Sequence, residues 1–282
     1  MNSKEKKIIK DEFLQLLNEF AKTLATYVSD KDNKWTIKGF IDIFEKIHTI
    51  SNDTKIVSKV LEIHLFPKFL EFAEKNNFKI ELATHQNWYP DISFISKRNE
   101  EIKFAVDLKT TYRLDDRPEF CNGFTLGSHG KYFIERTSKK NIQYPYSEYL
   151  GHYCLGIIYS RSALGNLERT QVYSLKDLQK IPSVINDFVF FACEKWTIAS
   201  DKGGSGNTAN IGGIQKIDDI LKGNGIFKHL GESWFDDYWM NFGKINIKIK
   251  KGKTKKISSM KEFVKYRGGN EKLINHKTSQ KK

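Results

Sequence analysis

Cysteine and proline are both scarce in this chain. The three cysteines, Cys121, Cys154 and Cys193, are odd in number and far apart, which excludes a disulfide framework and a zinc ribbon. Five prolines in the whole chain exclude a proline-rich linker architecture. We therefore expect a protein of a reducing compartment, the cytoplasm, held together without disulfides.

Long apolar runs are missing as well. No stretch approaches the roughly 18 apolar residues that a membrane-spanning helix needs. Residues 1–7 are rich in lysine, and no uninterrupted apolar run follows them, so we expect no signal peptide in this segment. The sequence predicts a soluble protein that has no membrane partner.

Large apolar side chains, by contrast, are plentiful. The 282 residues include 20 Phe, 12 Tyr and 5 Trp, and 39% of all residues are hydrophobic. This supply excludes a disordered chain and is enough for a sizeable core. The length fits one large domain or two small ones.

Positive charge collects at the C-terminus. The formal net charge is +13, and residues 244–282 hold 14 Lys and Arg against two acids. We therefore treat residues 1–243 as the main domain and residues 244–282 as a basic C-terminal segment, part of the same domain up to about residue 268. Such a segment suits contact with a polyanion, either nucleic acid or anionic lipid. The alternative is a solvated tail that only aids solubility.

Apolar periodicity predicts helices. Apolar side chains recur every three or four positions over residues 4–28, which is typical of an amphipathic helix. Residues 53–76 have the same period, with Asn52 or Asp53 as the N-cap, and Pro67 is expected to kink or end the first half. A short helix is expected over residues 214–222.

Alternation of apolar and polar residues predicts a sheet. Residues 78–82, 91–95 and 102–108 alternate in this way and favour three consecutive antiparallel strands. Two longer apolar runs follow at residues 149–161 and 188–198, the second a plausible strand. The sequence thus predicts an α+β fold in one domain, with a mixed or mostly antiparallel central sheet flanked by helices.

Two acids and a lysine stand at the ends of predicted strands. Asp91 opens one strand, and Asp107 and Lys109 end the strand two elements later, on one face because they are two residues apart. Pairing of the strands would bring Asp91 beside them. Two carboxylates attract a hard cation such as Mg²⁺, and a nearby ammonium suits attack by metal-bound water on a phosphodiester. The alternative is a surface strand pair with satisfied charges, and Glu62 on the second helix would then be a solvent-facing charge.

Residues 203–213 contain the densest run of glycine in the chain. They lack the lysine of a Walker phosphate loop and the βαβ context of a dinucleotide site. Asn207 can pair bidentately with adenine, and Thr208 can offer its methyl group to thymine. Gln86 and Asn87 form a second polar cluster just before the first carboxylate. The alternative for the glycine-rich stretch is a flexible linker.

Nine short segments together resemble a known family. Their sequences include Gln-Asn-Trp-Tyr-Pro-Asp at 86–91, Asp-Leu-Lys-Thr-Thr-Tyr at 107–112 and Gly-Ser-Gly-Asn-Thr-Ala-Asn-Ile-Gly at 204–212. The remaining segments lie at 52–55, 124–127, 141–145, 225–227, 237–239 and 266–268. In this order they resemble type II restriction endonucleases of the EcoRV family, which belong to the PD-(D/E)xK superfamily. The likeness covers about residues 50–268.

The resemblance implies a homodimeric enzyme with the restriction-endonuclease-like fold that cuts double-stranded DNA with Mg²⁺. The metal-binding carboxylates would fall on Asp91 and Asp107, with Glu62 as an auxiliary acid on the metal. The catalytic lysine would be Lys109. The enzyme would work in a bacterial cytoplasm, paired with a DNA methyltransferase of the same specificity.

The resemblance also implies how DNA would be held. The near-identical loop implies recognition of GATATC and cleavage at its centre to leave blunt ends. The base-reading residues would be Gly204, Ser205, Gly206, Asn207, Thr208 and Asn87. The DNA backbone would be contacted by Thr54, Lys55, Gln86, Thr111 and Lys140.

The sequence departs from the family pattern at a few positions. Ala209 replaces a threonine in the loop, and Met240 stands where the relatives have an arginine. One inserted residue before Asn141 makes Lys139 a rival of Lys140 as the phosphate contact. Two alternatives stay open: a catalytically silent DNA-binding module of the same fold, and a nuclease with a different recognition site.

Overall fold

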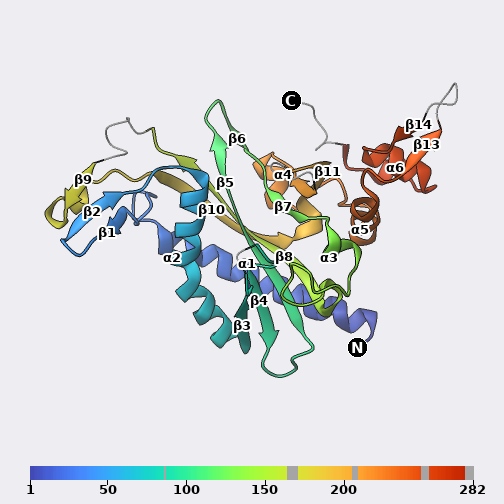
Figure 1. The fold of residues 1–282 in the computed structure, drawn as a ribbon, viewed down its shortest axis with the longest axis horizontal. Coiled ribbons are helices and arrows are strands. Elements are labelled where there is room, and N and C mark those ends of the chain that lie inside the picture. The colour runs from blue at the N-terminus through green and yellow to red at the C-terminus, as the bar shows by residue number, and fades with distance from the viewer. Residues whose placement is uncertain (86, 164–170, 205–208, 249–253, 277–282) are drawn as a thin grey trace.

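A six-stranded mixed sheet forms the centre of the computed structural model, which describes residues 1–85, 87–163, 171–204, 209–248 and 254–276 (Figure 1). The strand order is β10-β8-β5-β4-β3, and β6 pairs with β5. The strands are β3 (Phe78–Leu82), β4 (Ile92–Ser96), β5 (Lys103–Leu114), β6 (Arg117–Cys121), β8 (Tyr149–Arg161) and β10 (Ile185–Glu194). The expected antiparallel meander is confirmed as β3, β4 and β5.

β8 makes the sheet mixed because it lies parallel to β5, from the pair Lys103–Tyr149 to the pair Tyr112–Tyr159. Most of its residues are buried. A strand covered on both faces reads as a continuous apolar run rather than an alternating one, which explains the composition of residues 149–161. The α+β class with a mixed sheet is confirmed.

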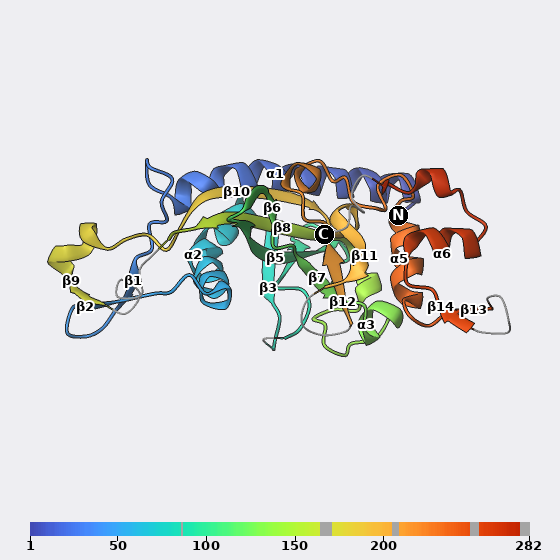
Figure 2. The same cartoon turned by 90° about the horizontal axis from the view of Figure 1, so that it is seen from above.

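Two long helices cover one face of the sheet. They are α1 (Ser3–Val28) and α2 (Thr54–Lys75), and Figure 2 shows α1 running along one side of the molecule. Phe13 of α1 stacks on Phe104 of β5 with ring centroids 3.9 Å apart. Lys10 binds both Glu194 and Glu232, at 2.7 and 2.8 Å. The helix is thereby tied to the sheet and to a later helix.

The ends of α2 follow local rules, but its middle does not. Asp53 is the N-cap, as expected, and its side chain accepts a hydrogen bond from the N–H of Lys55 at 2.9 Å. Of the two effects expected of Pro67, a kink or an end of the first half, the end is wrong, because the helix continues to Lys75. The buried Leu65 and Phe69 on either side of the proline pack on the sheet, and this packing outweighs the hydrogen bond that proline removes.

A second core lies on the opposite face, since Phe104 and Val106 join one apolar cluster while Ala105 joins the other. A small sheet in the order β11-β12-β7 packs there. The elements on this side are β7 (Thr125–Ser128), α3 (Lys131–Ile134), β11 (Ala199–Gly203), β12 (Asn210–Gly213), α4 (Ile217–Leu221) and α5 (Glu232–Asn241). The short helix expected near residues 214–222 is confirmed as α4.

The basic segment contributes to this second core. β13 (Asn246–Lys248) pairs with β14 (Thr254–Lys256), and α6 (Met260–Tyr266) follows. Phe263 and Ile274 are buried among the residues of the second core. The charged side chains of this segment are thus carried on a folded support as far as the described residues extend.

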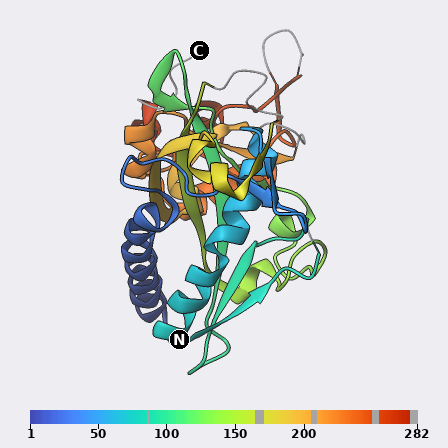
Figure 3. The ribbon, with the colours of Figure 1, turned by 90° about the vertical axis from the view of Figure 1, so that its left-hand side faces the viewer.

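A further, three-stranded sheet projects at the end of the molecule far from α6 (Figures 1 and 2), and Figure 3 views the molecule from this end. It consists of β1 (Gly39–Ile41), β2 (Lys46–Thr49) and β9 (Val172–Ser174), in that order. Within the described ranges, no helix combines the length and apolar character needed to cross a membrane.

Candidate active site

Asp91 and Asp107 meet where β4 begins. Ile92 pairs with Val106 in the antiparallel β4–β5 register. Asp91, just before Ile92, therefore lies opposite Asp107, just after Val106. The N–H of Leu108 donates to Oδ2 of Asp91 at 2.8 Å, and the N–H of Asp91 donates to Oδ1 of Asp107 at 3.3 Å. The structure therefore brings the two predicted carboxylates together. One detail differs: Asp107 does not end its strand, because β5 continues to Leu114.

Lys109 completes the cluster from the same face of β5. Its Nζ lies 3.0 Å from Oδ2 of Asp107, as expected of residues two apart on a strand. Burial would lower the pKa of Lys109, but the charges of Asp107 and Asp91 outweigh burial and raise it. Lys109 is therefore a fixed ammonium at neutral pH.

Asp91 is the carboxyl group of the pair that ionises less readily than usual. Burial, together with the charge of Asp107, raises its pKa to about 6. A carboxyl group in this position resists ionisation unless a cation is nearby. Two adjoining carboxylates offer the oxygen ligands that Mg²⁺ prefers, so the donor set fits a hard divalent ion.

Glu62 lies apart from this pair on α2. Its carboxylate binds Lys59, one helical turn earlier, at 2.7 Å, and its side chain is 44% exposed. Its charge still acts on Asp91 and raises the pKa of that carboxyl slightly further. Within the described part of the chain, no three acidic, histidine or cysteine side chains cluster closely enough to hold a metal. The structure thus joins Asp91 and Asp107 but leaves Glu62 at a distance.

The glycine-rich segment joins two paired strands rather than opening a helix. Gly204 donates its N–H to the carbonyl of Asn210 at 2.8 Å and so closes the β11–β12 hairpin. A Cβ at Gly204 would lie 3.0 Å from the carbonyl oxygen of Ile211 and 3.2 Å from Oγ1 of Thr125, so this position has little room for a side chain. Four predicted base-reading residues lie outside the described residues: Ser205, Gly206, Asn207 and Thr208.

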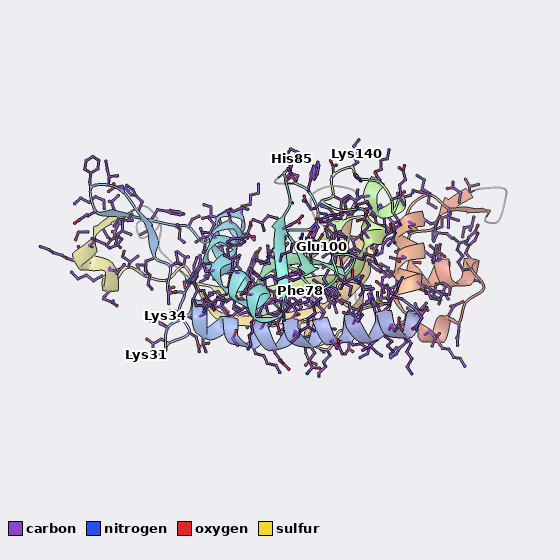
Figure 4. The ribbon with its side chains drawn as sticks, turned by 90° about the horizontal axis from the view of Figure 1, so that it is seen from below. Lys31, Lys34, Phe78, His85, Glu100 and Lys140 are labelled. Atoms are coloured by element: carbon purple, nitrogen blue, oxygen red, sulfur yellow. The ribbon has the colours of Figure 1, made fainter. Side chains whose placement is uncertain are left out.

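The other predicted DNA-contacting residues are mostly at the surface. Asn87 and Lys140 are exposed, and Figure 4 shows Lys140 and His85 on the side of the molecule opposite α1. Lys55 is exposed at the start of α2, with Thr54 half-buried beside it. Gln86 lies outside the described residues.

Thr111, unlike the other predicted DNA-backbone residues that the structure describes, is buried. Its side chain is hydrogen-bonded to the thiol of Cys121, and the residue is only 2% exposed. β6 folds back beside the end of β5 and brings Cys121 opposite Arg113. The hydroxyl group of Thr111 is therefore covered in the protein alone, and its contact with the DNA backbone stays a prediction.

A buried aromatic and basic cluster behind Asp107 was missed by the sequence reasoning. Tyr89 donates to or accepts from Nδ1 of His152 at 2.9 Å, and the ring of Tyr146 stacks on His152 at 3.6 Å. Lys195 lies over the ring of Tyr89, with Nζ 4.8 Å from the centroid. The available signal was the charged pair of Glu194 and Lys195 inside an otherwise apolar run.

A mixed sheet that carries two adjoining aspartates and a lysine at its centre fits a nuclease. Residues 31–268 match the family model described as restriction endonuclease EcoRV, so the chain belongs to this family and is a type II site-specific deoxyribonuclease. The type II restriction enzyme EcoRV of Escherichia coli is 33% identical over 246 residues, which are 87% of this chain and 97% of that enzyme. The fold and the enzyme class implied by the resemblance are confirmed.

Proposed function

We propose that this enzyme cuts duplex DNA at GATATC, at the centre of the site, with Mg²⁺ as its cofactor. The observation that carries the proposal is the contact of Asp91, Asp107 and Lys109 on two neighbouring strands. The recognition sequence rests on the likeness of residues 204–212 to the family loop. The single difference, Ala209, lies next to the residues that would touch bases.

Each member of the cluster has a separate task in this chemistry. Asp91 and Asp107 would hold Mg²⁺, with Glu62 as an auxiliary acid. The ion supplies a Lewis acid that makes bound water more acidic and neutralises charge on the phosphate. Lys109, fixed 3.0 Å from Asp107, presents an ammonium that stabilises the negative charge developing on the phosphate oxygens.

Recognition would come from the hairpin between β11 and β12 together with Asn87. Asn207 would pair with adenine, Thr208 would contact the thymine methyl group, and backbone groups of the glycines would approach the bases. Ser205 belongs to the same loop. Phosphates would be held by Thr54, Lys55, Gln86 and Lys140, which position the duplex without reading it.

A homodimer is supported by an apolar patch on the projecting sheet. The side chains of Phe40, Ile41, Ile43, Phe44 and Val172 are between 54% and 90% exposed. Several exposed apolar side chains on one small sheet are typical of an interaction surface. Because GATATC is self-complementary, a twofold dimer presents the same reading loop to each half-site. A methyltransferase of the same specificity would protect the DNA of the cell, in the cytoplasm, from the enzyme.

Digestion of a plasmid with one GATATC site tests the proposal. With Mg²⁺ we expect a single linear product, and sequencing of its ends should place both breaks at the centre of the site. Excess EDTA should stop cleavage, and Ca²⁺ should support binding without turnover because it holds its ligands loosely and acidifies water poorly. An Asp107→Asn variant is the matched inactive control.

Each failure of that digest has a distinct meaning. Cleavage in excess EDTA would refute the metal assignment. Clean cleavage at another sequence would refute the proposed site while leaving the chemistry intact, and it would direct attention to Ala209. Staggered ends would refute the central cut alone.

A further inference from the structure

Lys195 is buried in a place that is costly for an ammonium. It follows β10 in a 3₁₀ turn, Lys195–Ile198, and is 2% exposed. Its Nζ lies over the rings of Tyr89, Tyr146 and Phe133, at 4.8, 5.5 and 5.7 Å from the centroids. Within the described part of the chain, Nζ has no hydrogen-bond partner. Aromatic faces offset only part of the cost of burying a charge, so a nearby anion is needed.

Asp107 is that anion. A Cβ placed on Gly127 would lie 3.6 Å from Nζ of Lys195 and 3.9 Å from Oδ2 of Asp107. The two charged atoms are therefore at most about 7.5 Å apart, a range at which charges interact strongly in a protein interior. Gly127 has a φ of +87°, which favours glycine, and as a glycine it places no side chain next to the two charges.

The other charges near Lys195 do not replace Asp107. Asp236 binds Arg136 at 2.7 Å, so its charge is already matched. Lys109 carries the same sign as Lys195 and opposes it. The charge of Asp107 is the strongest attraction that acts on Lys195.

Lys195 remains a cation under ordinary conditions. Burial lowers its pKa to about 8, so the ammonium form still predominates at pH 7. The site therefore contains two carboxylates, Asp91 and Asp107, and two ammonium groups close to Asp107, those of Lys109 and Lys195.

We propose that Lys195 is a positioning residue whose buried charge, close to Asp107, sets how tightly the carboxylate pair binds its divalent cation. It touches neither the cation nor DNA. Its positive charge attracts the Asp107 carboxylate and repels a cation bound to that carboxylate. This inference rests on the proposed Mg²⁺ site at Asp91 and Asp107.

Replacement of Lys195 by Met separates charge from packing. Met keeps much of the volume and the apolar stem, and replacing a buried charge with an apolar group is often neutral for stability or better. Binding of Mn²⁺, as a probe for Mg²⁺, is measured by electron paramagnetic resonance on the full-length enzyme without DNA at pH 7. We expect Lys195→Met to bind Mn²⁺ about tenfold or more tightly than the unaltered enzyme, because one like charge is removed.

Two further variants serve as controls. Lys195→Arg keeps the charge and should bind Mn²⁺ within a few-fold of the unaltered enzyme. Lys222→Met removes an exposed lysine that binds Asp218 at 2.8 Å and should change nothing. A purely structural role for Lys195 predicts the opposite result, since a loosened site binds the cation more weakly.

The outcomes distinguish this inference from the metal proposal. Equal or weaker Mn²⁺ binding by Lys195→Met would overturn it. So would failure of both Lys195→Met and the second neutral variant, Lys195→Gln, to fold, because the lysine would then serve the fold first. If Asp107→Asn binds Mn²⁺ as well as the unaltered enzyme does, the metal site itself is wrong.

Discussion

Asp91→Asn should make the metal-free enzyme more stable while destroying its activity. In the folded enzyme the carboxyl of Asp91 is buried against Asp107, and its pKa rises from 3.8 to about 6. Asparagine keeps an oxygen that accepts from the N–H of Leu108, now 2.8 Å from Oδ2. It also brings an amide that can donate to Asp107, where the aspartate brings a second negative charge.

The size of the effect follows from the two pKa values. The folded state binds the proton of Asp91 more tightly than the unfolded chain does, so stability falls as the pH rises from about 4 to about 6. A raised pKa of about 2 units corresponds to about 3 kcal/mol in the free energy of unfolding. The variant should therefore gain up to about 3 kcal/mol above pH 7 and nothing below pH 4.

Urea unfolding of both proteins in EDTA, from pH 4 to pH 8, measures this difference directly. Only the difference between the two proteins is diagnostic, because other groups titrate in both. Addition of Mg²⁺ should then stabilise the unaltered enzyme and leave the variant almost unchanged. Two results would refute the raised pKa of Asp91. One is a variant no more stable than the unaltered enzyme at pH 8, and the other is a difference in stability that does not grow between pH 4 and pH 6.

Other predictions concern recognition, assembly and charge. Asn207→Ala should remove a bidentate hydrogen-bonded pair worth about 1–3 kcal/mol in each half-site, so cleavage of GATATC should collapse while weak non-specific binding survives. Lys109→Ala should keep selective binding in Ca²⁺ and abolish cleavage. Gel shifts and digestion on cognate and one-base-altered duplexes compare the two, and wild-type cleavage by either variant contradicts its assignment. Phe44→Lys, at a position 75% exposed, should convert the proposed dimer to a monomer in sedimentation, and a dimer that persists in the variant would exclude the exposed apolar residues of the projecting sheet as the interface. Replacement of the exposed Lys256 and Lys265 by Gln should flatten the slope of log affinity against log salt by about 0.9 for each phosphate that the protein no longer neutralises; an unchanged slope would leave them as solubility charges.

Local patterns were enough to predict α1, the β3–β5 meander and the shared face of Asp107 and Lys109. These features depend on periods of 3.6 and 2 residues and on which side must be buried. The convergence of Asp91 on Asp107 also followed, because antiparallel neighbours connected by a short turn have few possible registers.

Features that depend on distant segments could not be predicted in this way. Thr111 shares a face of β5 with Lys109 but is buried beside β6. The residues next to Thr111 in the sequence do not indicate this burial. The continuation of α2 through Pro67 depends on packing against the sheet. The position of Lys195 depends on the parallel pairing of β8 with β5 and the antiparallel pairing of β10 with β8, which join residues far apart in sequence.

The strand β7 has two neighbours that matter for different reasons. Along one edge it pairs with β12, the strand that leaves the glycine-rich hairpin, through Ser128 with Asn210 and Thr125 with Gly212. The next residue, His129, donates its N–H to the carbonyl of Ala209 at 2.8 Å. Between these contacts, Gly127 packs next to Asp107. The four-residue strand β7 thus connects the hairpin proposed to read DNA with a carboxylate proposed to bind Mg²⁺. A redesign of that hairpin for a new recognition site would therefore also alter the packing beside Asp107.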